Sequence, residues 1–455
     1  MVNFKLSEIL QIIGGRLLQG DPELPVTGIS TDSRKIKQGD LFLALKGERF
    51  DGHQFLSEAV KAGAAALLVM EDPGLDLETP VISVDDTLKA LGSIASAHRQ
   101  KYKVPIIGIT GSNGKTTTKD LVAAVLSQKY SIVKTKGNFN NEIGLPLTLL
   151  EMDENTEAVV VEMGMRGLGQ ISYLSSLAQP EIGIITNVGQ AHLELLGSQA
   201  NIAKAKAELI EALPPHGTAI LNGDDPLIRQ MPVPDQVNLI RFGIDHQELD
   251  YQAAVIKTNN EETLFRVSSG GKEFDISLPL PGRLNVYNAL VAIIIGLSFN
   301  LTLSEIQQGL AVPKLTERRL KIFKHNQMLI IDDTYNASPA SVRAALEVLC
   351  QTVGSGRKIA ILADMLELGD SSSVCHREVG EYAAKLGVDY LFAYGNLAEN
   401  YVSGFNSITP EKAEYFSNKA KLVREMKNFM LPGDSVLIKG SRGMKMEEIV
   451  EALSI

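Results

Sequence analysis

Short apolar runs rich in valine and isoleucine alternate with amphipathic stretches through the middle of the chain. The runs have the length of buried strands, and apolar positions between them recur at helical spacing. The predicted strands cover residues 104–109, 158–161, 182–185 and 218–221, and the predicted helices cover 116–128, 200–213 and 285–297. Because strands that alternate with helices form parallel sheets covered on both faces, this segment is predicted to be an α/β domain.

A similar alternation lies on both sides of this segment. It predicts strands at 40–45, 64–70, 328–332, 358–362, 390–394 and 435–439, helices at 55–63 and 88–101, and an amphipathic helix over residues 1–20. Residues 250–280 alternate polar and apolar positions, which is typical of antiparallel hairpins. A boundary near Lys103 and a linker-like stretch at 312–317 predict three domains, over 1–103, 104–313 and 314–455.

Length and composition limit the classes of function. The 455 residues suit about three domains, and 44% hydrophobic residues exclude a disordered chain. The net charge of -10 disfavours nucleic-acid binding, which needs a basic surface, but leaves room for a small anionic ligand. Two cysteines cannot build a disulfide framework, so a reducing cytoplasm is expected. No apolar run reaches the ~20 residues of a membrane span, and the N-terminal pattern does not predict a signal peptide.

The sharpest chemical motif is a glycine-rich loop between a predicted strand and a predicted helix. The sequence Ile109-Thr-Gly-Ser-Asn-Gly-Lys-Thr-Thr-Thr118 places Gly111 and Gly114 where backbone N–H groups would approach phosphate oxygens. Lys115 would reach the terminal phosphates and Thr116 would ligate Mg²⁺. The loop is shorter than the usual phosphate-binding motif, since the first expected glycine falls on Ile109. The alternative is a plain strand-to-helix turn with a solvated lysine.

Three further positions are candidates that the residues alone leave open. Glu162 ends the apolar strand at 158–161, so it is either a Mg²⁺-binding acid or a strand-end acid at the surface. His192 follows the strand at 182–185 and is either a ligand or a structural histidine. Lys206 shares a predicted helix with other charged residues, which is also the pattern of a solvated helix face.

Several separate stretches resemble the Mur ligases, the ATP-dependent amide ligases of peptidoglycan precursor synthesis. They lie in the family's order over almost the whole chain: Thr31–Ile36, Leu41–His53, Thr110–Thr118, Thr135–Pro146, Ile331–Pro339, Leu362–Gly369 and Val436–Arg442. The resemblance is closest to the branch that adds D-alanyl-D-alanine. Ser338 stands where that branch usually has Asn, and Ala363 stands where it commonly has Gly.

The resemblance implies a three-domain Mur ligase architecture. It comprises an N-terminal α/β domain for the UDP-sugar substrate, a central phosphate-loop domain with a parallel sheet, and a Rossmann-like C-terminal domain for nucleotide and incoming dipeptide. The implied reaction joins D-alanyl-D-alanine to UDP-N-acetylmuramoyl-tripeptide through an acyl phosphate, with ATP and Mg²⁺, in a cytoplasmic monomer that is not inserted in a membrane.

The resemblance also implies roles for individual residues. The implied catalytic residues are Lys115, Glu162, His192 and Lys206. The implied nucleotide-binding residues are Thr110, Gly111, Ser112, Asn113, Gly114, Lys115, Thr116, Thr117, Asn285, Asn288, Arg319 and Asp333. The implied substrate-binding residues are Ser33, Arg34, Lys46, Gly47, Asp51, Gly52, His53, Thr135, Asn138, Asn140, Asn141, Tyr335, Asn336 and Lys439. The implied metal site comprises Thr116, Glu162, His192 and a carbamylated Lys206.

Two other functions stay open. The first is a different ligase of the same superfamily, either tripeptide-forming or similar to folylpolyglutamate synthase. The block from Thr31 to His53 disfavours the folate branch, which lacks a comparable nucleotide-sugar domain. The second is a nucleotide switch that binds ATP without ligation, for which the loop resembling a muramoyl-peptide site at 135–146 would have no use.

Overall fold

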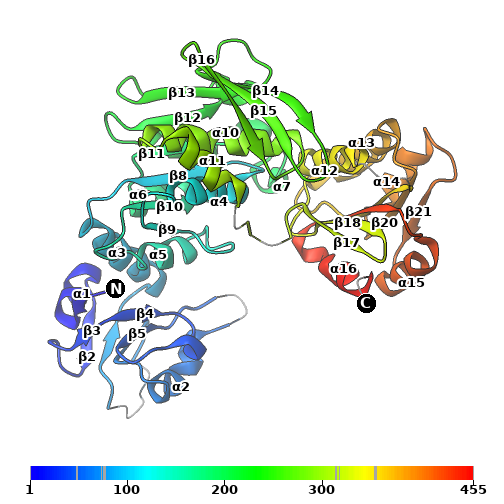
Figure 1. The fold of residues 1–455 in the computed structure, drawn as a ribbon. Coiled ribbons are helices and arrows are strands. Elements are labelled where there is room, and N and C mark those ends of the chain that lie inside the picture. Colours follow the sequence, from blue (N-terminus) through cyan, green and yellow to red (C-terminus); the bar gives the residue numbers. More distant parts are fainter. Residues whose placement is uncertain are drawn as a thin grey trace.

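The computed structural model describes residues 2–47, 50–72, 74, 78–312, 315–316, 318–352 and 356–453. Three large sheets follow one another along the chain, and the central one lies between the other two units (Figure 1). The expected α/β class is confirmed. The predicted boundary between 313 and 314 lies outside the described residues, and the one near Lys103 stays a prediction as a domain limit.

The N-terminal unit has a five-stranded sheet of order β2-β7-β6-β5-β4 and a two-stranded pairing of β1 with β3. Its strands are β1 (Phe4–Lys5), β2 (Arg16–Gln19), β3 (Pro25–Val26), β4 (Gly28–Ser30), β5 (Asp40–Leu43), β6 (Ala66–Val69) and β7 (Val81–Ser83). Its helices are α1 (Leu6–Ile13), α2 (Leu56–Lys61) and α3 (Thr87–Gln100).

The helix predicted over residues 1–20 is wrong in its extent. α1 ends at Ile13 because Gly14 adopts a left-handed backbone with φ of 64°, the usual way for a glycine to stop a helix. The chain then forms β2, which pairs antiparallel with β7 at one edge of the sheet. The apolar periodicity of this segment therefore belongs to two elements.

The central unit has a nine-stranded sheet of order β16-β15-β14-β13-β12-β11-β8-β10-β9. Its strands are β8 (Ile106–Thr110), β9 (Ile132–Lys134), β10 (Ala158–Glu162), β11 (Ile182–Ile185), β12 (Thr218–Asn222), β13 (Asn238–Gly243), β14 (Tyr251–Thr258), β15 (Thr263–Ser269) and β16 (Lys272–Leu278). Its helices are α4 (Lys115–Leu126), α5 (Gly144–Leu149), α6 (Gln170–Ala178), α7 (Leu193–Leu196), α8 (Gln199–Glu211), α9 (Pro226–Arg229), α10 (Arg283–Ser298) and α11 (Leu303–Ala311).

Pairing in this sheet is parallel from β9 to β14 and antiparallel between β14, β15 and β16. Both predictions for this segment are thus confirmed. β8 lies between β10 and β11 in the sheet. The chain goes from β8 to β9 and β10 on one side of it and then to β11 on the other side. Such a switch point opens a crevice at the carboxyl ends of parallel strands. Ile106 and Ile107 point into different buried clusters, as expected when helices cover both faces.

The C-terminal unit has a six-stranded sheet of order β17-β18-β22-β19-β20-β21, parallel apart from the β17–β18 hairpin. Its strands are β17 (Lys321–His325), β18 (Met328–Asp333), β19 (Lys358–Ala363), β20 (Tyr390–Tyr394), β21 (Ala413–Phe416) and β22 (Ser435–Lys439). Its helices are α12 (Pro339–Gln351), α13 (Ser372–Lys385), α14 (Glu399–Asn406), α15 (Lys419–Phe429) and α16 (Glu447–Leu453).

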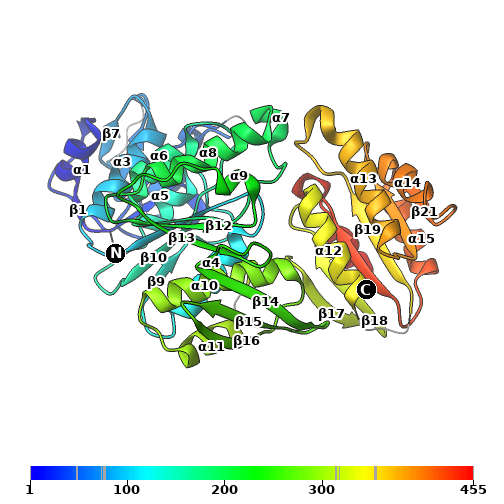
Figure 2. The same ribbon diagram turned by 90° about the horizontal axis from the view of Figure 1, so that it is seen from above.

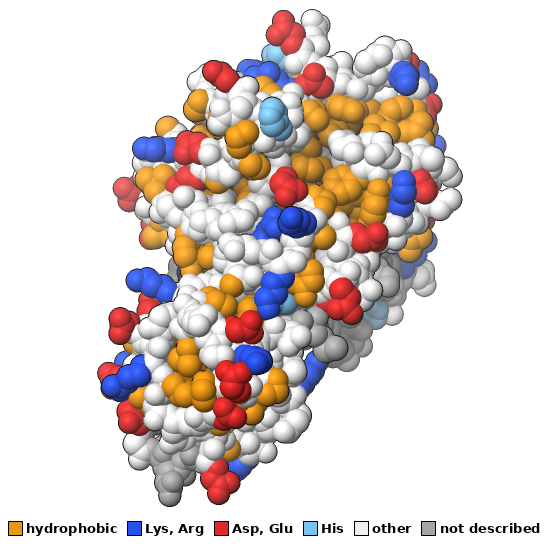
Figure 3. All heavy atoms as spheres, turned by 90° about the vertical axis from the view of Figure 1, so that its left-hand side faces the viewer, with side chains coloured by type: hydrophobic (Ala, Val, Ile, Leu, Met, Phe, Trp, Pro, Cys, Tyr) orange, Lys and Arg blue, Asp and Glu red, His pale blue; other side chains and the backbone are white. Residues whose placement is uncertain are grey.

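Figure 2 shows that α12 and the strand ends of the C-terminal unit face the central unit. On the face of the molecule drawn in Figure 3, acidic and basic side chains are interspersed, without the basic stripe that a phosphate backbone requires. No helix in the described part of the chain has both the length and the apolar character needed to cross a bilayer.

Candidate active site

The phosphate-loop motif lies where β8 meets α4. Gly111 and Gly114 have φ values of 151° and 81°, and α4 begins at Lys115, so the loop delivers a helix N-terminus to the crevice. The Lys115 ammonium donates a 2.6 Å hydrogen bond to the Gly111 carbonyl. Burial lowers the pKa of Lys115, the charge of Glu162 opposes that shift, and Arg319 adds to it. Two cations, Lys115 and Arg319, therefore lie close enough to act on each other in the cleft, as suits the binding of a polyphosphate.

Residues just after β11 hold the loop in shape. The Thr186 hydroxyl and the Asn187 amide donate to the Asn113 carbonyl at 2.6 and 2.9 Å, and Asn187 accepts from the Asn113 N–H at 2.9 Å. The Gly189 N–H donates to the Ser112 hydroxyl at 2.8 Å. Sequence reasoning did not single out Thr186 and Asn187. The usable signal was their place at the end of a strand that neighbours β8 in a parallel sheet.

Replacing Gly111 with alanine should damage this loop. An added Cβ would lie 1.9 Å from the Thr186 hydroxyl oxygen. This hydroxyl donates the hydrogen bond to the Asn113 carbonyl that holds the loop. We expect Gly111→Ala to lower the free energy of unfolding by about 2 kcal/mol and to weaken ATP binding. Gly167→Ala is the control, because a Cβ there meets no atom within 4 Å. Equal urea midpoints for the two variants would contradict this expectation.

Glu162, at the end of β10, is held on three sides. Its carboxylate accepts from the Thr116 hydroxyl and from the Asn140 amide, both at 2.8 Å, and its N–H donates to the Thr135 hydroxyl at 3.0 Å. Glu162 is 2% exposed. A carboxylate and a hydroxyl side by side next to a phosphate loop form the oxygen donor set that Mg²⁺ prefers, so these residues fit that ion. The surface-acid alternative is excluded by the burial.

Lys206 is buried in α8, although Lys204 on the same helix is exposed. It is 2% exposed, and no hydrogen bond or ion pair reaches its ammonium from the part of the chain that the structure describes. Burial, reinforced by the charge of Lys115, holds the pKa of Lys206 well below its ordinary value. Lys204, on the same helix, is exposed. The solvated-face alternative therefore describes Lys204 and not Lys206.

His192 directly precedes α7 and faces the C-terminal unit. Its Nδ1 lies 2.5 Å from an Oε2 of Glu367, and this contact lowers the pKa of Glu367. The Glu194 N–H donates to the Glu367 carbonyl at 3.3 Å. Sequence reasoning missed Glu367, although it lies in the quoted stretch 362–369. The contact ties the loop after β11 to the loop after β19.

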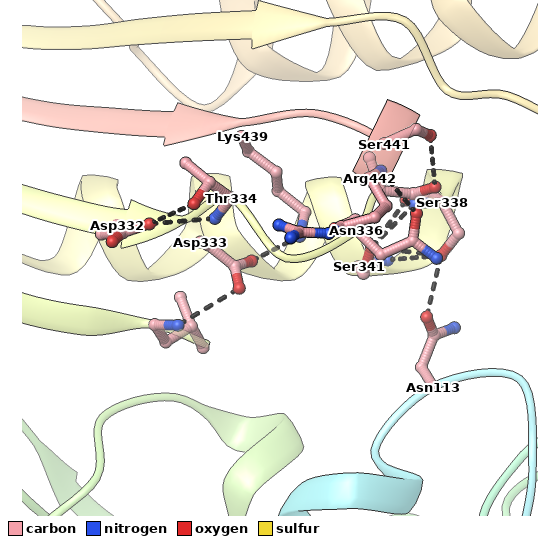
Figure 4. Close-up of polar contacts among 12 residues, drawn as sticks. Asn113, Asp332, Asp333, Thr334, Asn336, Ser338, Ser341, Lys439, Ser441 and Arg442 are labelled. Carbon is pink, nitrogen blue, oxygen red and sulfur yellow. Dashed lines mark hydrogen bonds and ion pairs between the residues drawn. The ribbon is translucent and has the colours of Figure 1, made fainter. Parts of the chain in front are cut away.

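The C-terminal side of the cleft is built from the ends of β18 and β22 (Figure 4). The Lys439 ammonium pairs with Asp333 and donates to the Asn336 carbonyl at 2.8 Å, and it is 2% exposed. The Ser338 hydroxyl donates to the Asn113 side-chain oxygen at 2.8 Å, so α12 contacts the phosphate loop directly (Figure 4). The serine that departs from the branch pattern thus makes an interdomain contact.

The cleft between these surfaces has a volume of about 1510 Å³. Predicted site residues that border it are Gly111, Ser112, Asn113, Gly114, Lys115, Thr116, Thr117, Asn138, Asn140, Asn141, Glu162, His192, Lys206, Asn285, Asn288, Arg319, Asp333, Tyr335, Asn336 and Lys439. Those that do not border it are Ser33, Arg34, Lys46, Gly47, Asp51, Gly52, His53, Thr110 and Thr135. Thr110 and Thr135 are fully buried, and Thr135 contacts Glu162 from inside the core.

The N-terminal candidates form a local structure of their own. His53 Nδ1 lies 2.6 Å from an Asp51 carboxylate oxygen, and His53 Nε2 accepts from the Met70 N–H at 3.0 Å. Lys46 pairs with Asp51 as an isolated antiparallel bridge, and Arg34 is tied to Asp32 at 2.8 Å. The structure does not bring these residues into the central cleft, whose N-terminal border is the start of α3.

A second polar cluster borders the cleft near α10. Asp224 accepts hydrogen bonds from the N–H groups of Ile244 and His246 and from the Tyr287 hydroxyl, all at 2.6 or 2.7 Å. Burial opposes ionisation, but these donors lower the pKa of Asp224. The hydroxyl of Thr118 donates to Asn288 at 3.0 Å, which joins α4 to α10. Sequence reasoning missed Asp224 and Tyr287.

Comparison with known proteins gives a consistent result. Three family models match in succession, a Mur ligase family catalytic domain over residues 25–99, a Mur ligase middle domain over 109–296 and a Mur ligase glutamate ligase domain over 318–442. The chain is 41% identical to the UDP-N-acetylmuramoyl-tripeptide–D-alanyl-D-alanine ligase of Bacillus subtilis and 37% identical to that of Escherichia coli. Each match covers 100% of this chain and 99% of the relative.

Comparison with solved structures points to the same family as the sequence comparisons. The chain is similar to crystal structure I of MurF from Acinetobacter baumannii with a TM-score of 0.92 and 32% identity, over 100% of this chain and 99% of that one. It is also similar to MurF ligase from Thermotoga maritima in complex with ADP, with a TM-score of 0.84 and 29% identity, over 94% and 97% of the two chains.

Proposed function

The chain belongs to the Mur ligase family, and from this premise we propose that it joins D-alanyl-D-alanine to UDP-N-acetylmuramoyl-tripeptide with consumption of ATP. The observation that carries the proposal is the cleft itself. It combines a phosphate loop, a clamped strand-end carboxylate and a C-terminal wall that contacts the loop directly. The full-length relatives in Bacillus subtilis and Escherichia coli bear the name of this activity.

Amide formation from a carboxylate requires a better leaving group than oxide. A carboxylate oxygen of the tripeptide attacks the γ-phosphorus of ATP, the bond to the bridging oxygen breaks, and ADP leaves. The neutral amine nitrogen of the dipeptide then attacks the acyl carbon, the bond to phosphate breaks, and the surplus proton passes to a base. Because both first reactants are anions, charge neutralisation and in-line positioning are the main catalytic tasks.

This chain's residues suit those tasks. Lys115 and the N-terminus of α4 would bind the β- and γ-phosphates, and Arg319 would add a second cation from the C-terminal side. Thr116 and Glu162 would hold Mg²⁺, which supplies charge withdrawal from phosphate oxygens when bound. His192 and Lys206, the latter as a carbamate, would support a second ion. The contacts Ser338–Asn113 and His192–Glu367 would keep water from the acyl phosphate while the domains are closed.

The three units would divide the substrates. Residues 1–103 would bind the UDP-sugar, 104–313 the ATP, and 314–455 the nucleotide and the dipeptide. The N-terminal candidates around His53 would then contact the uridine end, away from the chemistry. Both cysteines, Cys350 and Cys375, are free, which suits a cytoplasmic protein. We expect a monomer in solution.

The deciding experiment is product detection. After incubation with ATP, Mg²⁺, UDP-N-acetylmuramoyl-tripeptide and D-alanyl-D-alanine, mass spectrometry should detect UDP-N-acetylmuramoyl-pentapeptide together with equimolar ADP and phosphate. Omitting the dipeptide should remove the product. Product formation with a single amino acid in place of the dipeptide, or ADP release that ignores the dipeptide, would refute the proposal.

A further inference from the structure

The linker that enters the C-terminal unit is fastened to the phosphate-loop helix. The N–H and the hydroxyl of Thr316 both donate to one carboxylate oxygen of Asp120, each at 2.8 Å. Asp120 lies on α4, the helix that begins at Lys115. The two residues are far apart in sequence, so this is a tertiary contact and not a local turn.

Asp120 is itself immobilised. It is 2% exposed, and its other carboxylate oxygen lies 3.2 Å from the ammonium of Lys119 and 2.8 Å from that of Lys134. Burial opposes ionisation of Asp120, but the two lysines lower its pKa. Lys119 also donates to the Thr135 carbonyl at 2.9 Å. The linker is therefore bound to a charged and rigid acceptor.

The chain after Thr316 is fixed from the opposite side. The Arg318 carbonyl accepts from the Tyr335 N–H at 3.2 Å, and the Leu320 N–H donates to Asp333 at 3.2 Å. Arg318 and Leu320 have φ values of 65° and 49°, a conformation that residues other than glycine rarely adopt without support. Arg319 lies between these two positions, so the C-terminal unit holds the backbone on both sides of it, and Thr316 ties the preceding chain to α4.

The side chain of Arg319 borders the same cleft as the phosphate loop. Its guanidinium lies 4.0 Å from the centre of the Tyr335 ring, and its Nε is buried without a hydrogen-bond partner in the described part of the chain. It borders the same cleft as Lys115 and is close enough to lower the pKa of that lysine. A buried donor without an acceptor, close to a second cation, is an arrangement that favours the binding of an anion.

We propose that Asp120 and Thr316 are positioning residues for ATP binding, because their hydrogen bonds fix the linker so that Arg319 is presented to the phosphates beside Lys115. The inference rests on the proposed use of ATP and adds residues that do not border the cleft. Asp120 would act through Thr316, and Thr316 through Arg319.

The test uses the full chain and calorimetric titration with ATP and Mg²⁺. Thr316→Val removes the hydroxyl donor and keeps the shape of the side chain, and we expect about tenfold weaker binding. Thr316→Ser keeps the hydroxyl and should bind as the wild type does. In an Arg319→Ala background, which itself weakens binding, Thr316→Val should have little further effect, because the residues act in series.

Three results would overturn the inference: wild-type affinity in Thr316→Val, equal loss in Thr316→Ser, or an undiminished effect of Thr316→Val in the Arg319→Ala background. Binding does not require turnover, so the outcome is separable from the proposed function. A wild-type chain that binds ATP more tightly than Thr316→Val but forms no pentapeptide product would sink the ligase proposal and leave the positioning role intact. A wild-type chain that does not bind ATP at all would overturn both.

Discussion

Lys115→Ala should lower the turnover number by about 10³-fold or more and leave the fold intact. Lys115 is the first residue of α4, and its ammonium already reaches back over the loop to the Gly111 carbonyl. When the γ-phosphoryl group is transferred, negative charge grows on the phosphate oxygens that the Lys115 ammonium would contact. The N–H groups of the loop remain in the variant, so nucleotide binding should weaken much less than the chemical step does.

The measurement is dipeptide-dependent phosphate release at saturating substrates, with the thermal midpoint as a check of folding. Lys129→Ala is the matched control, because Lys129 follows α4 at its other end, does not border the cleft, and donates from its ammonium to the Asn300 carbonyl. It should keep normal turnover. Near-normal turnover in Lys115→Ala would remove the assignment of the loop as the phosphate site.

The sequence was sufficient to predict those parts of the candidate site whose residues lie close together along the chain. Strand, glycine-rich turn and helix follow one another without interruption in 104–128, so the loop and the position of Lys115 could be predicted from this order and from the Gly-Lys-Thr sequence, although the glycine spacing is unusual. Glu162 could be placed at the end of β10 for the same reason. Its burial could not, because it depends on Thr116, Asn140 and Thr135, which come from three other segments.

The interdomain features could not be predicted. The contacts His192–Glu367 and Ser338–Asn113 join residues whose proximity depends on how the central and C-terminal sheets are placed against each other. For Thr135, the predicted role in substrate binding stays a prediction. Its place in a stretch that resembles a substrate loop predicted a substrate contact, but Lys119 holds its carbonyl and the side chain lies in the core. A threonine at a strand end carries no sequence signal that separates these two roles.

Lys206→Gln should be the second severe variant, with turnover lowered by about 10³-fold. The ammonium of a 2% exposed lysine is unfavourable when no residue in the described ranges supplies a counter-ion, and the lowered pKa means that a neutral amine is present at pH values where an ordinary lysine is protonated. A neutral amine attacks CO₂ to form an N–C bond and releases one proton. The product is a carbamate, whose negative charge would suit the neighbouring Lys115 and a metal ion. Glutamine has similar length but no amine.

The carbamate makes this prediction separable from a loss of packing. Wild-type protein kept free of CO₂ should lose activity and regain it with bicarbonate, whereas Lys206→Gln should not respond. After addition of ¹³C-bicarbonate, a carbamate carbon signal should appear in the wild type and in the Lys204→Gln control, because Lys204 is exposed on the same helix. Lowering the pH protonates the amine, so the signal and the activity should fall together. A plain amine at Lys206 in fully active, ATP-saturated protein would contradict the carbamate and assign the buried lysine a direct role in the cleft.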